Sequence, residues 1–237
     1  MTLPQPCPDC GRRPPDSVGV AWHAPGCPWQ AQELTLRVLM SESLFAGGAV
    51  IWIYWRQLPL SWAAEPWLLA VLAGLAAAVA VFAVALFIFY CAPDVPGVRS
   101  LRRVFREMRP MFSTLRMPHL ILISVAAGVG EELFFRGALQ TNSNWVVASI
   151  CFGLAHVGGR DTLMYGVLAM AMGAGLSGLA AATGGLLAPI VAHAVYDAAA
   201  LAFCRWGNHA NSGAPAAPRD PDDREPTPDD PDAPGSL

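Results

Sequence analysis

Long runs of hydrophobic positions dominate the middle of the chain. Residues 67–92, from Trp67 to Ala92, contain 26 consecutive positions without a charged side chain. About 20 apolar residues are enough to cross the hydrocarbon core of a bilayer. This run therefore predicts a membrane-spanning helix, and with it an integral membrane protein.

Similar runs predict a polytopic, all-α membrane bundle of about six transmembrane helices within residues 31–206. Proline, glycine and asparagine mark the breaks between the runs, and these residues end helices or form turns. The fourth run is short for a full crossing, so we expect it to be tilted or shielded by its neighbours. The predicted helices are residues 35–57, 65–92, 118–141, 144–158, 162–182 and 185–205.

The segment between the second and third runs, residues 98–115, has a different pattern. Its arginines follow the helical spacing i, i+3, i+4, i+7, and its apolar side chains fall on the opposite face. These arginines are Arg99, Arg102, Arg103 and Arg106. Such a helix lies in the membrane surface. Because this is the most basic short loop, it should be cytoplasmic, and six crossings then place both termini in the cytoplasm.

Charge is distributed unevenly. The chain has 15 basic residues, all arginine, and a net charge of −3. Residues 207–237 hold seven prolines and seven acids against two arginines, so this tail should be disordered. The negative net charge of the chain therefore comes from this tail. An arginine-only, alanine-rich chain favours a bacterial source and the cytoplasmic (inner) membrane, and no basic run interleaved with aromatics indicates nucleic acid.

Residues 1–30 carry a separate pattern of soft metal ligands. Cys7, Cys10, His23 and Cys27 are spaced C-x2-C-x12-H-x3-C. Two close pairs separated by about a dozen residues are typical of tetrahedral structural zinc. We expect a small zinc-ribbon-like cytoplasmic module that docks a protein partner. The alternative is a flexible proline-rich lead with incidental cysteines.

Ionisable side chains inside the membrane carry the functional signal. Glu131, His156 and His193 lie on three different predicted helices. At 1.5 Å per residue, Glu131 lies about 20 Å from the cytoplasmic end of its helix. His193 and His156 lie about 12 and 18 Å from the outer ends of theirs. Ionisable groups that share one depth mark a functional site by default.

Helical spacing predicts how these groups are paired. Glu132 and Arg136 are four residues apart, as are His193 and Asp197, so each pair shares a helix face. Glu131 is rotated by about 100° from Glu132, which leaves its carboxylate free. Phe152 shares a face with His156 and could wall the site. The alternatives are a structural ion pair or a proton relay.

These residues form three motifs in order along the chain. They are Glu131-Glu132-x-x-x-Arg136, Phe152-x-x-x-His156 and His193-x-x-x-Asp197. The pattern resembles the CPBP family of intramembrane proteases. That family includes the Rce1-like type II CAAX prenyl endopeptidases, bacteriocin-immunity proteins and abortive-infection proteins. The match covers roughly residues 118–205.

The resemblance implies a role for each residue. Glu131 and His156 would activate the attacking water, and His193 with the residue four later would stabilise the oxyanion. Glu132 and Arg136 would hold the site together.

Asp197 stands where better-understood family members have asparagine. An ionised aspartate cannot donate a hydrogen bond to an oxyanion. Asp197 is therefore protonated, orients His193 or helps to bind a metal. Metal-dependent and metal-free, glutamate-dependent catalysis both stay open.

The leading hypothesis is an intramembrane endopeptidase that hydrolyses a peptide bond in a peptide or protein substrate reached through the lipid bilayer. In a bacterial host that substrate is expected to be unprenylated. The alternative is a non-catalytic membrane scaffold or bacteriocin-immunity-type factor. A proton-coupled transporter is a third option, although internal repeat halves are lacking.

Metal content tests the proposed module and the site together. We expect about one zinc per purified chain, and none after deletion of residues 1–30, while proteolysis survives. Elemental analysis of both forms measures this. If the truncated protein instead keeps one tightly bound metal that His156→Ala or His193→Ala removes, the metal belongs to the membrane site.

Overall fold

The structure, a computed structural model, describes residues 28–63, 66–112 and 115–206. All of these residues belong to one unit of the chain, Met1–Gly207. Within them the fold is all-helical, as predicted. The expected zinc ligands Cys7, Cys10, His23 and Cys27 and the acidic tail lie outside the described residues.

The helices follow the predicted runs closely. They are α1 (Pro28–Arg56), α2 (Trp67–Tyr90), α3 (Pro96–Phe112), α4 (Met117–Glu132), α5 (Trp145–Ala155), α6 (Leu163–Thr183) and α7 (Leu187–Trp206). In the described part of the chain, five helices are long and apolar enough to cross a membrane: α1, α2, α6, α7 and α4 with its continuation to Gln140. α1 begins before residue 35 because polar residues such as Glu33 extend the helix beyond the apolar run.

The fourth predicted helix is shorter than its hydrophobic run. α5 has 11 residues, which gives about 16 Å of helix against a hydrocarbon core of about 30 Å. Its end at Ala155, rather than residue 158, is followed by a short loop and a 3₁₀-helix, η2 (Arg160–Thr162), that contacts α3. There Ser100 Oγ donates to the Asp161 carbonyl at 3.0 Å, and Arg103 lies 3.9 Å from the Asp161 carboxylate.

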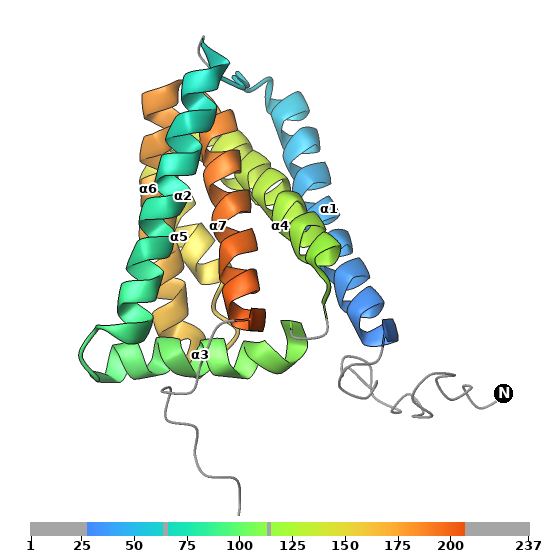
Figure 1. Ribbon diagram of the computed structural model, residues 1–237. Coiled ribbons are helices and arrows are strands. Elements are labelled where there is room, and N and C mark those ends of the chain that lie inside the picture. Colours follow the sequence, from blue (N-terminus) through green and yellow to red (C-terminus); the bar gives the residue numbers. More distant parts are fainter. Residues whose placement is uncertain (1–27, 64–65, 113–114, 207–237) are drawn as a thin grey trace, which may run out of the picture. The chain divides into compact units, whose positions relative to one another are not determined.

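α3 lies across one end of the helices, as Figure 1 shows. Its apolar face includes Val104 and Phe112, which are both buried. Arg102 Nη2 donates to the carbonyls of Ile88 at 3.0 Å and Ala92 at 2.8 Å. These carbonyls lie at the end of α2, where no further helical turn can satisfy them. The basic face of α3 therefore also fastens α3 to α2.

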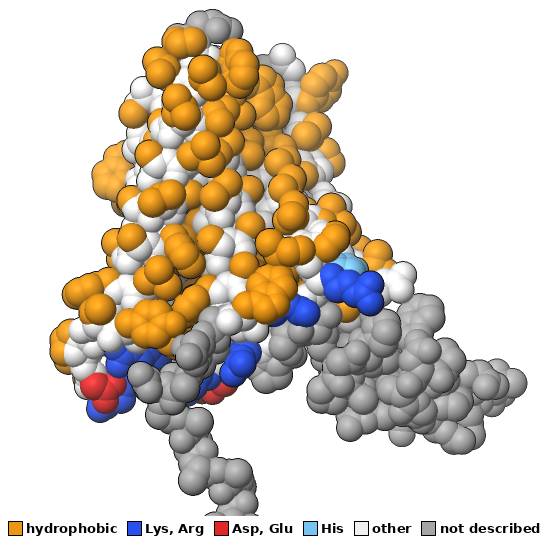
Figure 2. Space-filling model, viewed as in Figure 1, with side chains coloured by type: hydrophobic (Ala, Val, Ile, Leu, Met, Phe, Trp, Pro, Cys, Tyr) orange, Lys and Arg blue, Asp and Glu red, His pale blue; other side chains and the backbone are white. Residues whose placement is uncertain are grey.

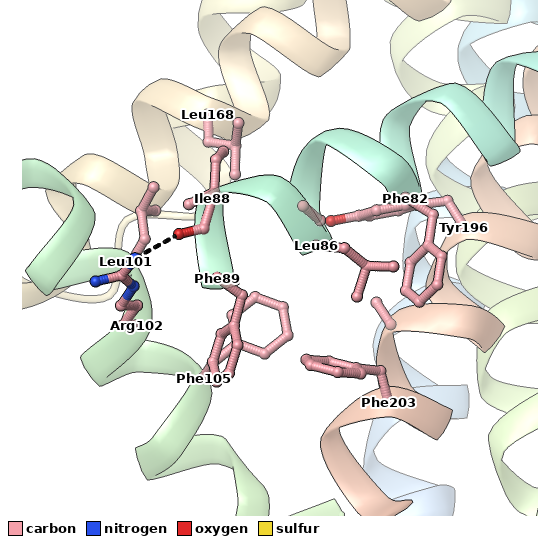
Figure 3. Close-up of a pocket in the computed structure, with 12 residues that line it drawn as sticks. Phe82, Leu86, Ile88, Phe89, Leu101, Arg102, Phe105, Leu168, Tyr196 and Phe203 are labelled. Carbon is pink, nitrogen blue, oxygen red and sulfur yellow. Dashed lines mark hydrogen bonds between the residues drawn. The ribbon is translucent and has the colours of Figure 1, made fainter. Parts of the chain in front are cut away.

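A small apolar pocket lies where α2, α3, α6 and α7 meet (Figure 3). Aromatic rings from three of these helices line it, and Phe89 and Phe203 make an edge contact with centroids 5.2 Å apart. None of the described residues that line it carries a carboxylate or an imidazole. The pocket is therefore separate from the ionisable cluster described below.

The surface agrees with a membrane environment. Figure 2 shows hydrophobic side chains over most of the visible face, with arginines and acidic residues gathered at the α3 end. Large side chains such as Leu44, Ile51 and Val79 are more than half exposed. Exposed apolar surface on this scale is rare on soluble monomers. The described helices are those of an integral membrane protein.

At the opposite end, the loop after α1 is joined to the loop after α6. The backbone amide of Leu187 donates to the Trp62 carbonyl at 2.7 Å. Gly184 ends α6 with a φ of 68°, a left-handed conformation that glycine adopts without strain. A Cβ on Gly185 would lie 2.5 Å from the Trp62 carbonyl carbon. The two glycines thus allow the turn and the close contact between these loops.

Close packing of α7 against its neighbours also depends on glycine. A Cβ on Gly74 of α2 would lie 2.6 Å from the Ala188 carbonyl oxygen of α7. A Cβ on Gly128 of α4 would lie 2.9 Å from the Ala194 Cβ of α7. Small residues let membrane helices approach until their backbones touch. α7 is therefore held between α2 and α4.

We predict that Gly74→Ala lowers stability by about 1–3 kcal/mol, because the added methyl group forces α2 away from α7. Gly175→Ala on α6 is the matched control, because a Cβ there meets nothing within 4 Å. Thermal unfolding of both variants in detergent measures the difference. Equal melting temperatures would contradict the close α2–α7 contact.

Candidate active site

The first motif begins in α4 and continues into a different kind of helix. α4 ends at Glu132, and a π-helix, η1 (Leu133–Gln140), follows without interruption. In a π-helix each backbone N–H donates to the carbonyl five residues earlier, and such turns occur frequently at functional sites. Arg136 lies in η1. The predicted helix over 118–141 is thus continuous, and no residue pattern indicated its change of winding.

Arg136 and Glu132 form the buried centre of the cluster. Arg136 Nη1 donates to Glu132 Oε1 at 2.8 Å, and both side chains are fully buried. Arg136 Nη2 donates to the Gly173 carbonyl of α6 at 3.0 Å. The guanidinium carbon also lies 4.5 Å from the centre of the Phe152 ring of α5. One side chain therefore contacts α4, α5 and α6.

His193 of α7 joins the same carboxylate. Its Nδ1 lies 2.8 Å from Glu132 Oε1. Because the Glu132 carboxylate already accepts from Arg136, we assign the hydrogen to His193 Nδ1. His193 Nε2 lies 3.5 Å from Asp197 Oδ2, one turn further along α7. The ring is held between two carboxyl groups, and its contact with Glu132 was not part of the sequence prediction.

His156 lies just beyond the end of α5 and faces Glu131. Its Nδ1 is 2.7 Å from the Phe152 carbonyl oxygen, and a carbonyl can only accept, so Nδ1 carries a hydrogen. In the neutral ring, Nε2 then presents a lone pair. That nitrogen lies 3.9 Å from Glu131 Oε2. The separation is too long for a direct hydrogen bond, and one water molecule can bridge such a gap.

Exposure separates the cluster into two groups. The Glu132 and Arg136 side chains are 0% exposed and His193 is 4% exposed. Glu131 is 12%, His156 22% and Asp197 28% exposed. Among the buried groups, Glu132 Oε1 accepts from both Arg136 and His193. By contrast, Glu131, His156 and Asp197 are partly open to water or a substrate. All six sequence-predicted polar residues thus belong to one cluster.

Aromatic rings border this cluster. The Phe152 ring centre lies 4.7 Å from that of His156 and 5.8 Å from that of His193. The Phe152 ring therefore borders both imidazoles. Tyr165 of α6 lies 5.8 Å from His156, centre to centre. Sequence reasoning did not identify Tyr165, because its position on an otherwise apolar helix carries no motif.

A second residue that sequence reasoning missed is Glu42 of α1. Its side chain is buried, with 8% of the residue exposed. Its Oε2 has no hydrogen-bond partner among the described residues. A carboxylate in a hydrophobic helix is itself a functional signal, and Glu42 could have been identified on that ground. It lies outside the three motifs.

The described residues do not form a ready metal site. No group of three or more histidine, cysteine, aspartate or glutamate side chains within them is arranged to hold an ion. The geometry gives a reason, because both ring nitrogens of His193 already face carboxyl groups. A metal at His193 Nε2 would have to displace or share Asp197.

Comparison with known proteins agrees with the motifs. Residues 113–199 match the family described as "Type II CAAX prenyl endopeptidase Rce1-like". This segment contains all three motifs, and the resemblance predicted from them is confirmed. This match to an endopeptidase family, together with the membrane-spanning helices, supports an intramembrane protease type.

A curated relative matches a similar length of chain. "Uncharacterized protein YpbD" of Bacillus subtilis (strain 168) is 30% identical over 90 residues, which is 38% of this chain and 48% of the relative. The match therefore spans about half the length of that relative. No solved structure matches.

The buried ion pair should be far more important for stability than an exposed pair of the same spacing. Arg136→Met leaves the Glu132 carboxylate partly unpaired, which we expect to cost about 3–5 kcal/mol. The matched control is Arg37→Met, which removes an i,i+4 pair with Glu33 on an exposed face of α1 and should cost about 0–1 kcal/mol. Unfolding in detergent measures both, and similar losses would contradict the central role of the buried pair.

Proposed function

We propose that this protein is a membrane-embedded endopeptidase in which Glu131 and His156 activate a water molecule for peptide-bond hydrolysis. The observation that carries the proposal is the pair itself. Glu131 of α4 and His156 after α5 face each other across 3.9 Å, and both are partly exposed. Their neighbours Glu132 and Arg136 are fully buried.

The hydrogen-bond pattern suits water activation. His156 Nδ1 is committed to the Phe152 carbonyl, so Nε2 of the neutral ring accepts a hydrogen from water. An ionised Glu131 accepts the second hydrogen of the same water molecule. The water oxygen then directs a lone pair away from both groups and towards a substrate carbonyl carbon. As the new C–O bond forms, Glu131 takes the proton as general base.

His193 and Asp197 supply the matching stabilisation of negative charge. His193 Nδ1 is held by Glu132, and its Nε2 lies 3.5 Å from Asp197 Oδ2. We propose that a proton shared between Nε2 and Asp197 donates to the substrate oxyanion, because an ionised aspartate alone cannot donate. Donors fixed before the reaction stabilise developing charge effectively.

The substrate class follows from location and surface. The helices present apolar side chains to the bilayer (Figure 2), so we propose a peptide or protein segment that enters from the membrane. A bacterial host favours an unprenylated chain. We propose the inner membrane, with the α3 end and its arginines facing the cytoplasm.

Metal-free catalysis is the form that we favour. The His193 nitrogens are engaged by Glu132 and Asp197, and the proposed hydrolysis needs only acceptors and donors that these side chains provide. We further propose that structural zinc is bound by Cys7, Cys10, His23 and Cys27 and supports docking of a protein partner.

The second candidate function is a membrane scaffold or immunity factor that acts by binding. The observation that favours it is the buried network itself, because Glu132 Oε1 accepts from both Arg136 and His193 without any substrate. The partly exposed Glu131 and His156 have no place in this alternative. Their substitution therefore separates the two functions.

We predict that Glu131→Gln and His156→Ala each lower proteolysis at least 100-fold, because general-base catalysis contributes about 10²–10⁴-fold. Cleavage of an internally quenched transmembrane peptide library in liposomes measures this. Glu33→Gln, which changes a partly exposed carboxylate near the start of α1 that pairs with Arg37, is the control and should keep wild-type activity.

Two outcomes would contradict the prediction. Wild-type cleavage by Glu131→Gln would exclude the proposed base. Full complementation of a deletion strain by the inactive variants would show that the protein acts by binding.

A further inference from the structure

Glu42 is the buried carboxyl group that the proposed reaction does not yet use. It lies in the middle of α1, which packs against α4 and η1. The residue is 8% exposed, and its Oε2 has no partner among the described residues. Burial of an unpaired carboxylate is costly unless the group keeps a proton or serves a function.

The backbone places Glu42 beside the proposed base. A Cβ on Gly130 of α4 would lie 2.8 Å from the Glu42 carbonyl oxygen and 3.1 Å from Glu42 Oε2. Gly130 directly precedes Glu131. The absence of a side chain at Gly130 therefore lets the Glu42 carboxyl group lie against α4 at the residue next to Glu131.

The charges around Glu42 come from several helices. Glu42 interacts electrostatically with Glu131, His193 and Asp197. The groups of the cluster are Glu131 and Glu132 on α4, Arg136 on η1, His156 after α5, and His193 and Asp197 on α7. Arg136 is already paired with Glu132. Neighbouring carboxyl groups in an apolar setting disfavour ionisation of both, so one of Glu42 and Glu131 can retain a proton.

We propose that Glu42 is the general acid that protonates the leaving nitrogen, a role that rests on the proposed hydrolysis. Water loses one proton to Glu131 while its oxygen bonds to the carbonyl carbon. The C–N bond then breaks, and the nitrogen takes the proton held by Glu42. The proton on Glu131 passes to Glu42, which restores the pair. The products are a carboxylic acid and an amine.

A change of leaving group tests this role. An amine must be protonated as it leaves, whereas an alkoxide is a better leaving group and depends less on a general acid. The probes are the best-cleaved transmembrane peptide of the library and the same peptide with an ester at the cleaved bond. Both are assayed in liposomes with the full-length protein.

We expect Glu42→Gln to lower kcat for the amide at least tenfold, with KM within twofold, and to lower kcat for the ester much less. The alkaline limb of the pH–kcat profile, which reports the protonated acid, should disappear. Glu42→Asp should restore part of the amide activity. Glu33→Gln on the same helix should leave the cleavage rates of both substrates unchanged.

A second variant tests the geometry independently. Gly130→Ala should push α1 from α4 and lower amide cleavage more than ester cleavage, even if Glu42→Gln folds poorly. Equal loss for both substrates, or no loss in Glu42→Gln, would overturn the role of Glu42 while an inactive Glu131→Gln leaves the proposed function standing. An active Glu131→Gln would instead defeat the proposed function itself.

Discussion

One carboxylate organises the described helices. Glu132 Oε1 accepts from Arg136 and from His193, each at 2.8 Å. In an apolar interior, removal of one partner leaves a buried charge uncompensated, so each contact depends on the others. Arg136 extends the network to the Gly173 carbonyl of α6 and the Phe152 ring of α5. Helices α4, α5, α6 and α7 are thereby connected through one carboxylate oxygen.

Glu131 does not take part in the buried ion pair that its neighbour Glu132 forms. Adjacent helical positions differ in direction by about 100°, so Glu131 points away from the ion pair and towards His156. Each glutamate of the motif thus has its own environment, one fully buried and the other 12% exposed. The buried network holds α4 and α7 rigidly, and this holds the proposed base and the proposed oxyanion donors at fixed positions.

Local sequence patterns predicted much of this arrangement. They did not predict the contacts between residues far apart in the sequence. Hydrophobic runs located the helices, and i,i+4 spacing located the Glu132–Arg136 pair, because both depend on residues close in sequence. The contact of His193 with Glu132 depends on how α7 packs against α4. The π-helix η1 and the early end of α5 follow from packing as well. Glu42 itself could have been noticed as a carboxylate in a hydrophobic helix, but its place beside α4 depends on the packing of α1 against Gly130.

Glu42 also lies outside the family resemblance. Residues 113–199 match the family, whereas Glu42 comes from α1. The motifs alone provide a base with its supporting groups, and α1 adds a second carboxyl group beside that base. Asp197 adds another carboxyl group where better-understood family members have an asparagine. A site with this many carboxyl groups retains protons, and amide hydrolysis needs a retained proton when the nitrogen leaves. The proposed chemistry of this chain therefore depends on α1 as much as on the three motifs.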